Sequence, residues 1–303
     1  MSITIAWIKW MYLTFVVTWG FDNLSTNKPT EQYIETDTCT KCVAGNAVDG
    51  NNETCMRTKD IGINSNIHTT WWYVDLGNNY SLYSIRIEFQ KETQFVSEHT
   101  RKGRFAGFSL YVSNTTNKDD GFVCYQNESR IPPLDFNTSC ITHGQYVIFY
   151  NERVVGKKYP SEYQTSNVIT ELCEVTVQGC LKPGVYGEFC NETCPDNCQE
   201  NRCDIISGTC LGCNPGWNGT YCNTTCLDGH YGLNCALKCV GRCKDHDPCN
   251  HTTGLCDNGC ADGWTGGNCT DGCSENLIFF FNFMNIWKSL NTLHLINSII
   301  MNT

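Results

Sequence analysis

The chain has 303 residues, of which 23 are cysteines, and its formal net charge is −10. So many cysteines are rare in a reducing cytosol, and the acidic balance excludes the basic patches on which nucleic-acid binding depends. The length suffices for about two domains. The composition therefore predicts a disulfide-bonded extracellular protein that does not bind nucleic acid.

The first residues predict a signal peptide. Lys9 precedes the apolar run Met11–Val17, and polar sequence begins at Asp22. This order is typical of a secretory signal, and the run is too short for a membrane span; an uncleaved anchor is the alternative. We expect residues 1–20 to direct the chain to secretion or to the extracellular face of the plasma membrane.

The acceptor sequence of N-linked glycans, Asn-X-Ser/Thr, indicates the same compartment. Eleven such sites occur, at Asn23, Asn52, Asn79, Asn114, Asn127, Asn137, Asn191, Asn218, Asn223, Asn250 and Asn268. The surface of the protein is therefore expected to carry glycans.

Residues 35–179 predict a β-sandwich. Apolar residues alternate with polar ones in segments such as 84–89 and 107–113, and Gly, Asn, Asp or Pro bound each segment. A period of two is typical of strands with one buried face, and no long helical stripe interrupts them. We expect at least one of Trp71 and Trp72 to lie in the core, since a tryptophan pair is more often packing than a binding platform.

From Cys180 the cysteines follow a repeat of eight per unit, which predicts one unit at residues 180–225 and another at 226–272. Units of this size cannot fold on an apolar core, so disulfides must stabilise them. Zinc binding by Cys210 and Cys213 is the alternative, which an oxidising compartment and an even cysteine count disfavour.

The last cysteine, Cys273, follows Cys269 at the interval at which Cys226 follows Cys222. We therefore interpret residues 273–303 as a truncated third repeat with an apolar tail. The tail, residues 277–303, contains too many asparagines for a membrane span. An alternative terminus of a longer repeat protein, a gene-model artefact and a GPI signal all remain open, and membrane attachment is expected only of a longer form.

Three separated motifs carry a resemblance to a known family: Ala47–Gly50, Trp71–Leu76 and Leu172–Val177. With them, the first domain resembles a fucolectin–tachylectin–pentraxin domain, one of the galactose-binding-like jelly rolls that include discoidin-type domains. The repeats resemble the EGF-like, laminin-type units of multiple-EGF-domain and class F scavenger receptors. The resemblance implies a mostly β fold: a jelly-roll β-sandwich followed by small disulfide-rich repeats.

The resemblance also implies a bound, structural calcium ion, which is held by hard oxygen ligands. The expected ligands are the carboxylates of Asp49 and Glu174, the hydroxyl of Thr54, and the main-chain carbonyls of Asn46, Asn51 and Cys173. The alternative is that Asp49-Gly50 is only a turn. The family further implies the disulfides Cys55–Cys173 and Cys124–Cys140, whereas the pairing of Cys39, Cys42 and Cys273 stays open.

The fucose site of the family is only partly present. Fucose-binding members use a histidine and two basic residues, in a pattern that includes Arg-X-Asp and an adjacent cysteine pair. Here Arg57 stands near the histidine position and Arg104 at the last basic position, while no Arg-X-Asp occurs between Ser84 and Gly107. Arg57 and Arg104 are therefore the candidate ligand-binding residues.

Two functions remain as hypotheses. The first is an extracellular scavenger-like or multiple-EGF-receptor-like ectodomain for ligand binding or adhesion, and the second is a calcium-dependent lectin for fucosylated or other glycans. The partner is then a glycan or a protein on cells or particles, and the sequence carries no signal for an oligomeric state. The sequence contains no nucleophile elbow, zinc-protease motif or phosphate loop, so we expect no enzyme activity.

Overall fold

The computed structural model describes residues 20–34, 39–91, 97–127 and 130–273. The expected signal peptide, apart from Gly20, and the tail after Cys273 lie outside these residues. The chain divides into two compact units, one made of residues 1–194 and 203–208, the other of 195–202 and 209–303. No helix within the described ranges combines the length and the apolar character needed to cross a membrane.

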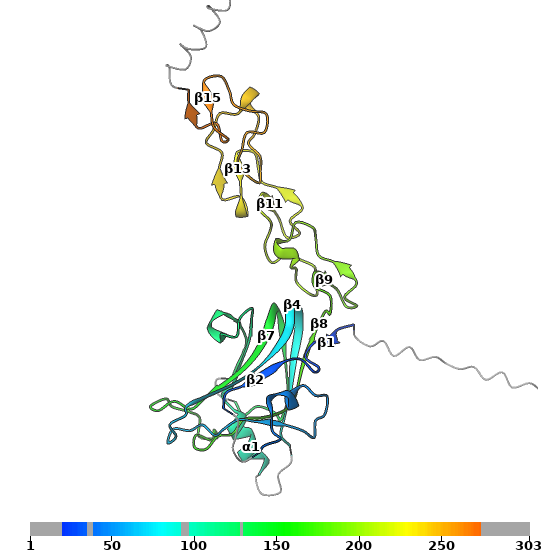
Figure 1. Ribbon diagram of the computed structural model, residues 1–303, viewed down its shortest axis with the longest axis vertical. Helices are drawn as coiled ribbons and strands as arrows, with labels where there is room; N and C mark the ends of the chain where they lie inside the picture. Colours follow the sequence, from blue (N-terminus) through cyan, green and yellow to red (C-terminus); the bar gives the residue numbers. More distant parts are fainter. Residues whose placement is uncertain (1–19, 35–38, 92–96, 128–129, 274–303) are drawn as a thin grey trace, which may run out of the picture. The chain divides into compact units, whose positions relative to one another are not determined.

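The first unit contains an antiparallel sheet, with strands of very different lengths, that is folded into two layers (Figure 1). Its strands are β1 (Asp22–Asn23), β2 (Thr30–Gln32), β3 (Met56–Arg57), β4 (Thr69–Phe89), β5 (Ser109–Ser113), β6 (Phe122–Gln126), β7 (Asp135–Glu152) and β8 (Glu171–Gly179). Three short helices join them: η1 (Ala44–Ala47), α1 (Glu98–Phe105) and η2 (Lys118–Asp120). Strands β1 and β2 precede residue 35, where the sandwich was predicted to begin. Strands of two or three residues are too short to show the alternation of apolar and polar residues.

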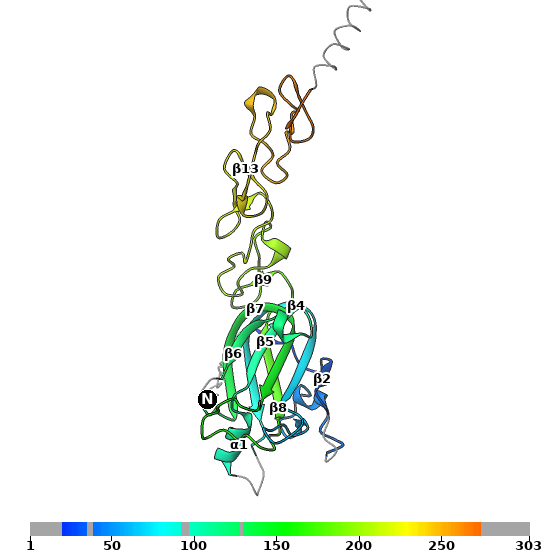
Figure 2. The same cartoon turned by 90° about the vertical axis from the view of Figure 1, so that its left-hand side faces the viewer.

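Strands β4 and β7 run through both layers. In one layer Trp71 of β4 lies opposite Tyr150 of β7, and β5 and β6 continue the sheet beyond β7 (Figure 2). In the other layer the C-terminal half of β4 pairs with β8 on one side and with the start of β7 on the other. Irregularities in the register between Asp75 and Tyr80, and near Leu82, let the strands bend from one layer into the next.

The alternating residues fill the core, as the period of two requires. Ile85, Ile87 and Phe89 of β4 are at most 1% exposed, and so is Trp72, whose indole nitrogen donates a hydrogen bond to the Ala44 carbonyl at 3.0 Å. Trp71 points to the outer side of the same strand and is half-buried. The prediction of a mostly β sandwich followed by disulfide-rich repeats is confirmed.

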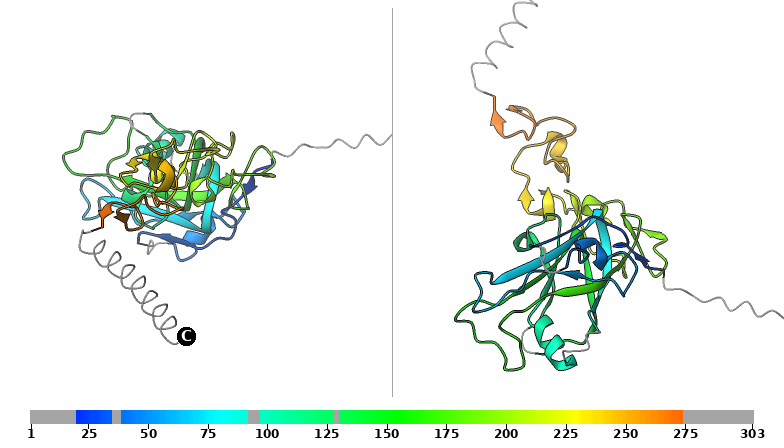
Figure 3. Two further views of the ribbon diagram at one scale, coloured as in Figure 1. Left: turned by 90° about the horizontal axis from the view of Figure 1, so that it is seen from above. Right: turned by 60° about the horizontal axis from the view of Figure 1, so that its bottom comes forward.

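A fully buried arginine, Arg153, anchors the end of the sandwich that carries α1 (teal in Figure 3). Its guanidinium donates to the carbonyls of Gln164 at 2.6 Å and Ala106 at 2.9 Å, and to the side chain of Asn151 at 2.9 Å. Burial lowers its pKa to about 10, so the group stays charged at neutral pH. Arg153 therefore joins the loop after α1 and the chain around Gln164 to the end of β7.

The two repeats have the same disulfide pattern: first cysteine to second, third to fifth, fourth to sixth and seventh to eighth. The bonds are Cys180–Cys190, Cys194–Cys203, Cys198–Cys210 and Cys213–Cys222, then Cys226–Cys235, Cys239–Cys249, Cys243–Cys256 and Cys260–Cys269. Cys210 and Cys213 are thus both in disulfides, and Cys273 is a free thiol. The sequence alone had left this connectivity open.

The repeats add little regular structure. They contain the two-stranded pairs β9–β10 (Val185–Tyr186, Glu192–Thr193), β11–β12 (Trp217–Asn218, Thr224–Thr225), β13–β14 (His230–Tyr231, Leu237–Lys238) and β15–β16 (Trp264–Thr265, Asp271–Gly272), with the short helices η3 (Gln199–Asn201), η4 (Leu233–Cys235) and η5 (Lys244–His246). Each repeat also seats one tyrosine against a glycine of positive φ, Tyr186 on Gly208 and Tyr231 on Gly254. A side chain at either glycine would collide with the ring. Because the same contact occurs in both repeats, it is a feature of the repeated unit.

Replacing Arg153 by methionine should lower the free energy of unfolding by about 3 kcal/mol or more, because several buried carbonyls would lose their donor. Urea unfolding of the purified protein measures this loss. The control is Arg86→Met, which removes an ion-paired arginine whose side chain is 45% exposed and should cost less than about 1 kcal/mol. Equal losses in the two variants would contradict the anchoring role of Arg153.

Candidate functional site

The loop of residues 46–54, which begins in the last turn of η1 and ends shortly before β3, is held in shape by its own polar groups. One carboxylate oxygen of Asp49 accepts from the amide of Asn51 at 2.9 Å, and the other accepts from the hydroxyl of Thr54 at 2.6 Å. Gly50 has a φ of 78°, a left-handed conformation that glycine adopts without strain. The turn that is the alternative interpretation of Asp49-Gly50 is therefore present, and four of the expected calcium ligands lie in this loop: Asn46, Asp49, Asn51 and Thr54.

Strand β8 places Glu174 against this loop. The carboxylate of Glu174 is 9% exposed and accepts a hydrogen bond from the amide of Gly50 at 3.1 Å. Its pKa is raised to about 7, chiefly by burial and also by the nearby negative charges of Asp49 and Glu88, against the lowering effect of the Gly50 amide. A half-desolvated carboxylate beside two other carboxylates is an unfavourable arrangement that a cation would relieve.

A disulfide joins the two segments that carry these oxygens. Cys55, which follows Thr54, is bonded to Cys173, which precedes Glu174. The side-chain amide of Asn46 donates a hydrogen bond to the main-chain carbonyl of Cys55 at 3.1 Å, which closes the base of the loop. The structure thus brings together Asp49, Thr54, Cys173 and Glu174, and this pairing is the one that the resemblance implies, as is the bond between Cys124 and Cys140.

The chemistry of this donor set fits calcium. Two carboxylates, a hydroxyl and main-chain carbonyls are the hard oxygen ligands that calcium prefers. Within the described residues no group of three or more His, Cys, Asp and Glu side chains is placed to hold a metal ion. The expected set contains only two carboxylates, and its remaining oxygens come from the main chain and from Thr54.

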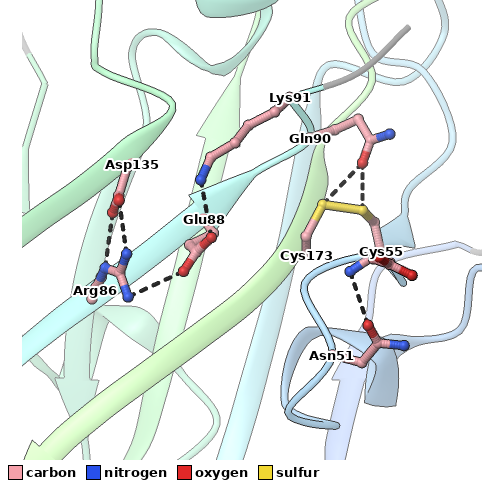
Figure 4. Close-up of polar contacts among 9 residues, drawn as sticks. Asn51, Cys55, Arg86, Glu88, Gln90, Lys91, Asp135 and Cys173 are labelled. Atoms are coloured by element: carbon pink, nitrogen blue, oxygen red, sulfur yellow. Dashed lines mark hydrogen bonds and ion pairs between the residues drawn. A yellow bond between two sulfur atoms is a disulfide. The ribbon is translucent and has the colours of Figure 1, made fainter.

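An open cavity of about 420 Å³ lies beside the loop. It is lined by Asn52, Glu53, Glu88, Phe89, Gln90, Lys91 and Cys173. The amide oxygen of Gln90 lies 2.5 Å from the sulfur of Cys55 and 3.0 Å from that of Cys173 (Figure 4). Because disulfide sulfurs carry no proton, these are close contacts and not hydrogen bonds. Through Cys173, the disulfide forms one wall of the cavity.

The charged groups beside the cavity form a chain of ion pairs along β4 (Figure 4). Lys91 contacts Glu88 at 3.1 Å, Glu88 contacts Arg86 at 3.1 Å, and Arg86 makes two bonds to Asp135 of β7, at 2.7 and 2.8 Å. The hydrogen bonds from Arg86 hold the pKa of Asp135 below its usual range. The ammonium of Lys91 and the carboxylate of Glu88 are thereby oriented before any ligand arrives.

The two arginines expected to bind sugar lie elsewhere. Arg57 of β3 donates two hydrogen bonds to the buried carboxylate of Glu171, at 2.6 and 2.9 Å. Arg104 is half-buried on α1, and its carbonyl accepts from Arg153 at 3.2 Å. Neither residue lines the cavity beside the loop.

Sequence reasoning missed Glu88, Gln90 and Lys91. These residues lie between Ser84 and Gly107, the segment that lacks the Arg-X-Asp pattern of the fucose site. The signal that could have found them is the end of the alternation at Phe89, because residues that follow the last buried position of a strand lie at the rim of a sandwich.

Comparison with known proteins places this domain in context. Residues 46–148 match the family model described as "NedA-like, galactose-binding domain", and the domain is a galactose-binding-like β-sandwich. No curated protein sequence matches the chain.

Three similar solved structures illustrate the range. A fucolectin from Morone saxatilis (striped bass) serum is 20% identical with a TM-score of 0.38, over 52% of this chain and 47% of that one, so the chain spans about half the length of that lectin. A Streptococcus pneumoniae fucose binding module is 16% identical with a TM-score of 0.37, over 52% and 96% of the two chains. Chitosan-binding module 2 of a Paenibacillus sp. IK-5 chitosanase/glucanase, in complex with chitotriose, is 18% identical with a TM-score of 0.38, over 51% and 98%.

Besides the short-range bond Cys39–Cys42, the sandwich has two disulfides that should differ in their effect on stability. Cys55 and Cys173 are 118 residues apart, against 16 for Cys124 and Cys140. In the chain-entropy model, removing the first bond costs about 5 kcal/mol and removing the second about 3 kcal/mol. We expect the Cys55→Ala/Cys173→Ala protein to unfold at lower urea concentration than Cys124→Ala/Cys140→Ala, and the opposite order would contradict this account.

Proposed function

We propose that this chain is an extracellular glycan-recognition protein whose ligand occupies the cavity beside the Cys55–Cys173 disulfide. The observation that carries the proposal is the preorganised set of polar groups around that cavity. Lys91, Glu88 and Gln90 offer a charged donor, a charged acceptor and an amide, which together can bind the neighbouring hydroxyls of a sugar. The match of residues 46–148 to a galactose-binding family supports the same assignment.

The ligand expected from this chemistry is a neutral sugar. The charged residues that line the cavity are Glu53, Glu88 and Lys91, so its formal charge is small and negative and does not favour an anionic sugar. This arrangement differs from the three basic positions of a fucose site. We therefore propose that the residues at the end of β4 form hydrogen bonds to the hydroxyls of a sugar, and that the protein binds this sugar without catalysing a reaction.

A receptor role is a second, finer proposal. The two disulfide repeats, which we interpret as EGF-like, favour a receptor-type protein that joins a recognition domain to repeats, as scavenger-like or adhesion ectodomains do. The eleven disulfides of the described residues suit secretion or the extracellular face of the plasma membrane. Cell fractionation that finds the protein inside cells only would contradict this proposal.

The glycan proposal is tested on an array of neutral glycans with the secreted protein and its Lys91→Met variant. We expect binding by the unaltered protein and a loss of about tenfold in affinity for the variant, since a charged hydrogen bond is removed from the site. The control is Lys102→Met, which breaks an ion pair between Lys102 and Glu98 on α1, away from the cavity lining.

Asn52 needs a separate arm of this experiment. It lines the cavity and also begins an acceptor sequence for N-linked glycosylation, so an attached glycan would lie at the site. The array is therefore repeated with Asn52→Gln. Silence of both the unaltered protein and Asn52→Gln across all neutral glycans would sink the proposal.

We further propose that the loop of residues 46–54 holds a structural calcium ion. Asp49 and Glu174 would supply its carboxylates, Thr54 its hydroxyl, and Asn46, Asn51 and Cys173 their main-chain carbonyls. The ion would supply positive charge to a buried site in which the carboxylates otherwise repel each other. The support for this proposal is the clustering of these oxygens and the raised pKa of Glu174.

Calcium at a hundred times its dissociation constant should stabilise the fold by about 2.7 kcal/mol, which raises the melting temperature by several degrees. Differential scanning calorimetry in calcium and in EDTA measures the shift. Glu174→Gln should abolish the response, and Glu53→Gln, an acidic residue of the same loop outside the expected set, should retain it. An identical melting temperature in calcium and in EDTA for the unaltered protein would count against the site.

A further inference from the structure

The outer face of one sheet layer is aromatic. Because successive residues of a strand point to opposite sides, the buried Trp72 and Val74 leave their neighbours Trp71 and Tyr73 facing outward. We call this surface the aromatic face; its half-buried members are Tyr33, Trp71, Tyr73, Tyr111, Tyr146 and Tyr150. The outward positions of a sandwich strand are normally polar, so an aromatic set on this side calls for a role other than packing of the core.

The rings of the aromatic face are held in fixed positions. Trp71 and Tyr73 are nearly parallel, with an interplanar angle of 13° and centroids 5.6 Å apart, and the edge of Tyr73 meets Tyr146. The hydroxyl of Tyr150 donates to Glu152 at 3.0 Å, and that of Tyr73 is hydrogen-bonded to Glu31. These contacts hold the two parallel rings of Trp71 and Tyr73 in place, and they bond the hydroxyls of Tyr73 and Tyr150 to carboxylates.

A cavity of about 410 Å³ lies over this surface. Eight residues line it, among them Trp71, Tyr73 and Tyr150 as the aromatic wall, with Glu31, Asn117 and Lys118 as polar groups. Lys118 comes from η2, and its ammonium lies 5.0 Å from the centroid of the Tyr150 ring. Aromatic surface and hydrogen-bonding groups thus converge on one space of the size that small ligands occupy.

The chemistry of the cavity selects its occupant. The formal charges of the lining residues, Glu31 and Lys118, cancel, so the cavity suits a neutral molecule. A sugar ring presents a face of C–H groups, which pack on aromatic rings, and an edge of hydroxyls, which bond to carboxylate, amide and ammonium groups. Eight lining residues are few against the 20–30 that each side of a stable protein interface contributes.

We propose that the aromatic face is a second carbohydrate-binding site, which takes a free neutral oligosaccharide stacked on Trp71 and Tyr73. This site is built from β2, β4, β7 and η2 and shares no lining residue with the cavity beside the disulfide. The inference therefore does not rest on the function proposed above. With two sites on one domain, a branched or polymeric glycan would be held at two points, which raises its apparent affinity.

One competitor for the site is a glycan of the chain itself. Asn114 is exposed and begins the acceptor sequence Asn114-Thr115-Thr116, and Thr116 lines the cavity. A glycan attached there would start at the border of the aromatic face. The experiment therefore uses the secreted full chain both unaltered and as Asn114→Gln.

Short cello-, chito-, manno- and galacto-oligosaccharides are titrated into both proteins by isothermal calorimetry, with tryptophan fluorescence as a second readout. We expect at least one of them to bind Asn114→Gln. Adding Trp71→Ala should weaken that binding by about tenfold or more, since the stacking surface is lost. Adding Glu31→Gln, which preserves the shape of the site, should weaken it several-fold and covers the case in which Trp71→Ala folds poorly.

The controls separate the two sites. Tyr83→Ala removes a tyrosine of the same strand that stacks on Phe21, outside both cavities, and should leave binding unchanged, as should Lys91→Met. Binding that survives both Trp71→Ala and Glu31→Gln would overturn the proposal. So would failure of Asn114→Gln to bind any of the oligosaccharides, which would leave the glycan on Asn114 as the occupant of the aromatic face.

Discussion

The disulfide between Cys55 and Cys173 joins two segments that are 118 residues apart, and three features of the sandwich depend on it. It brings the loop with Asp49 and Thr54 next to the strand with Glu174. It forms a wall of the cavity in which Gln90 lies, and it closes the longest disulfide loop of the described chain. Because Cys55 follows Thr54 and Cys173 precedes Glu174, the bond between the sulfur atoms also holds the segments of the Thr54 hydroxyl and the Glu174 carboxylate side by side.

Strand β4 distributes function over the domain. Its first half turns Trp71 and Tyr73 outward, and its second half carries Glu88 close to the rim. In a regular strand Glu88 would point to the side of the buried Trp72, opposite Trp71 and Tyr73. The register irregularities near Asp75 and Leu82 shift the alternation and let β4 serve both layers. The aromatic face and the cavity beside the Cys55–Cys173 disulfide therefore belong to different surfaces, although β4 supplies residues to both.

The sequence predicted those parts of the structure that a local pattern encodes. Alternation in Ile85, Ile87 and Phe89 identified a strand with a buried side, because burial on one side imposes a period of two. The same pattern could not say whether Trp71 or Trp72 faces the core, since that depends on which side the second layer covers. The disulfide pattern of the repeats and the partners of Arg153 depend on contacts across the fold, which no local pattern records. Gln90 and Lys91 carry no pattern at all, because they follow a strand rather than belong to one.

The charges at the rim explain why this end of the sandwich is suited to binding rather than to packing. Arg86 is paired with Asp135 and Lys91 with Glu88, and these pairs lie at or near the surface, where they cost little and contribute little to stability. Glu174 differs, since it is buried and its carboxylate accepts a hydrogen bond from the main-chain amide of Gly50. A buried carboxylate beside Asp49 and Glu88 lowers the stability of the fold unless a proton or a cation compensates its charge. A cation at the proposed site would compensate the charge of Glu174 and would in turn hold the loop of residues 46–54 against β8.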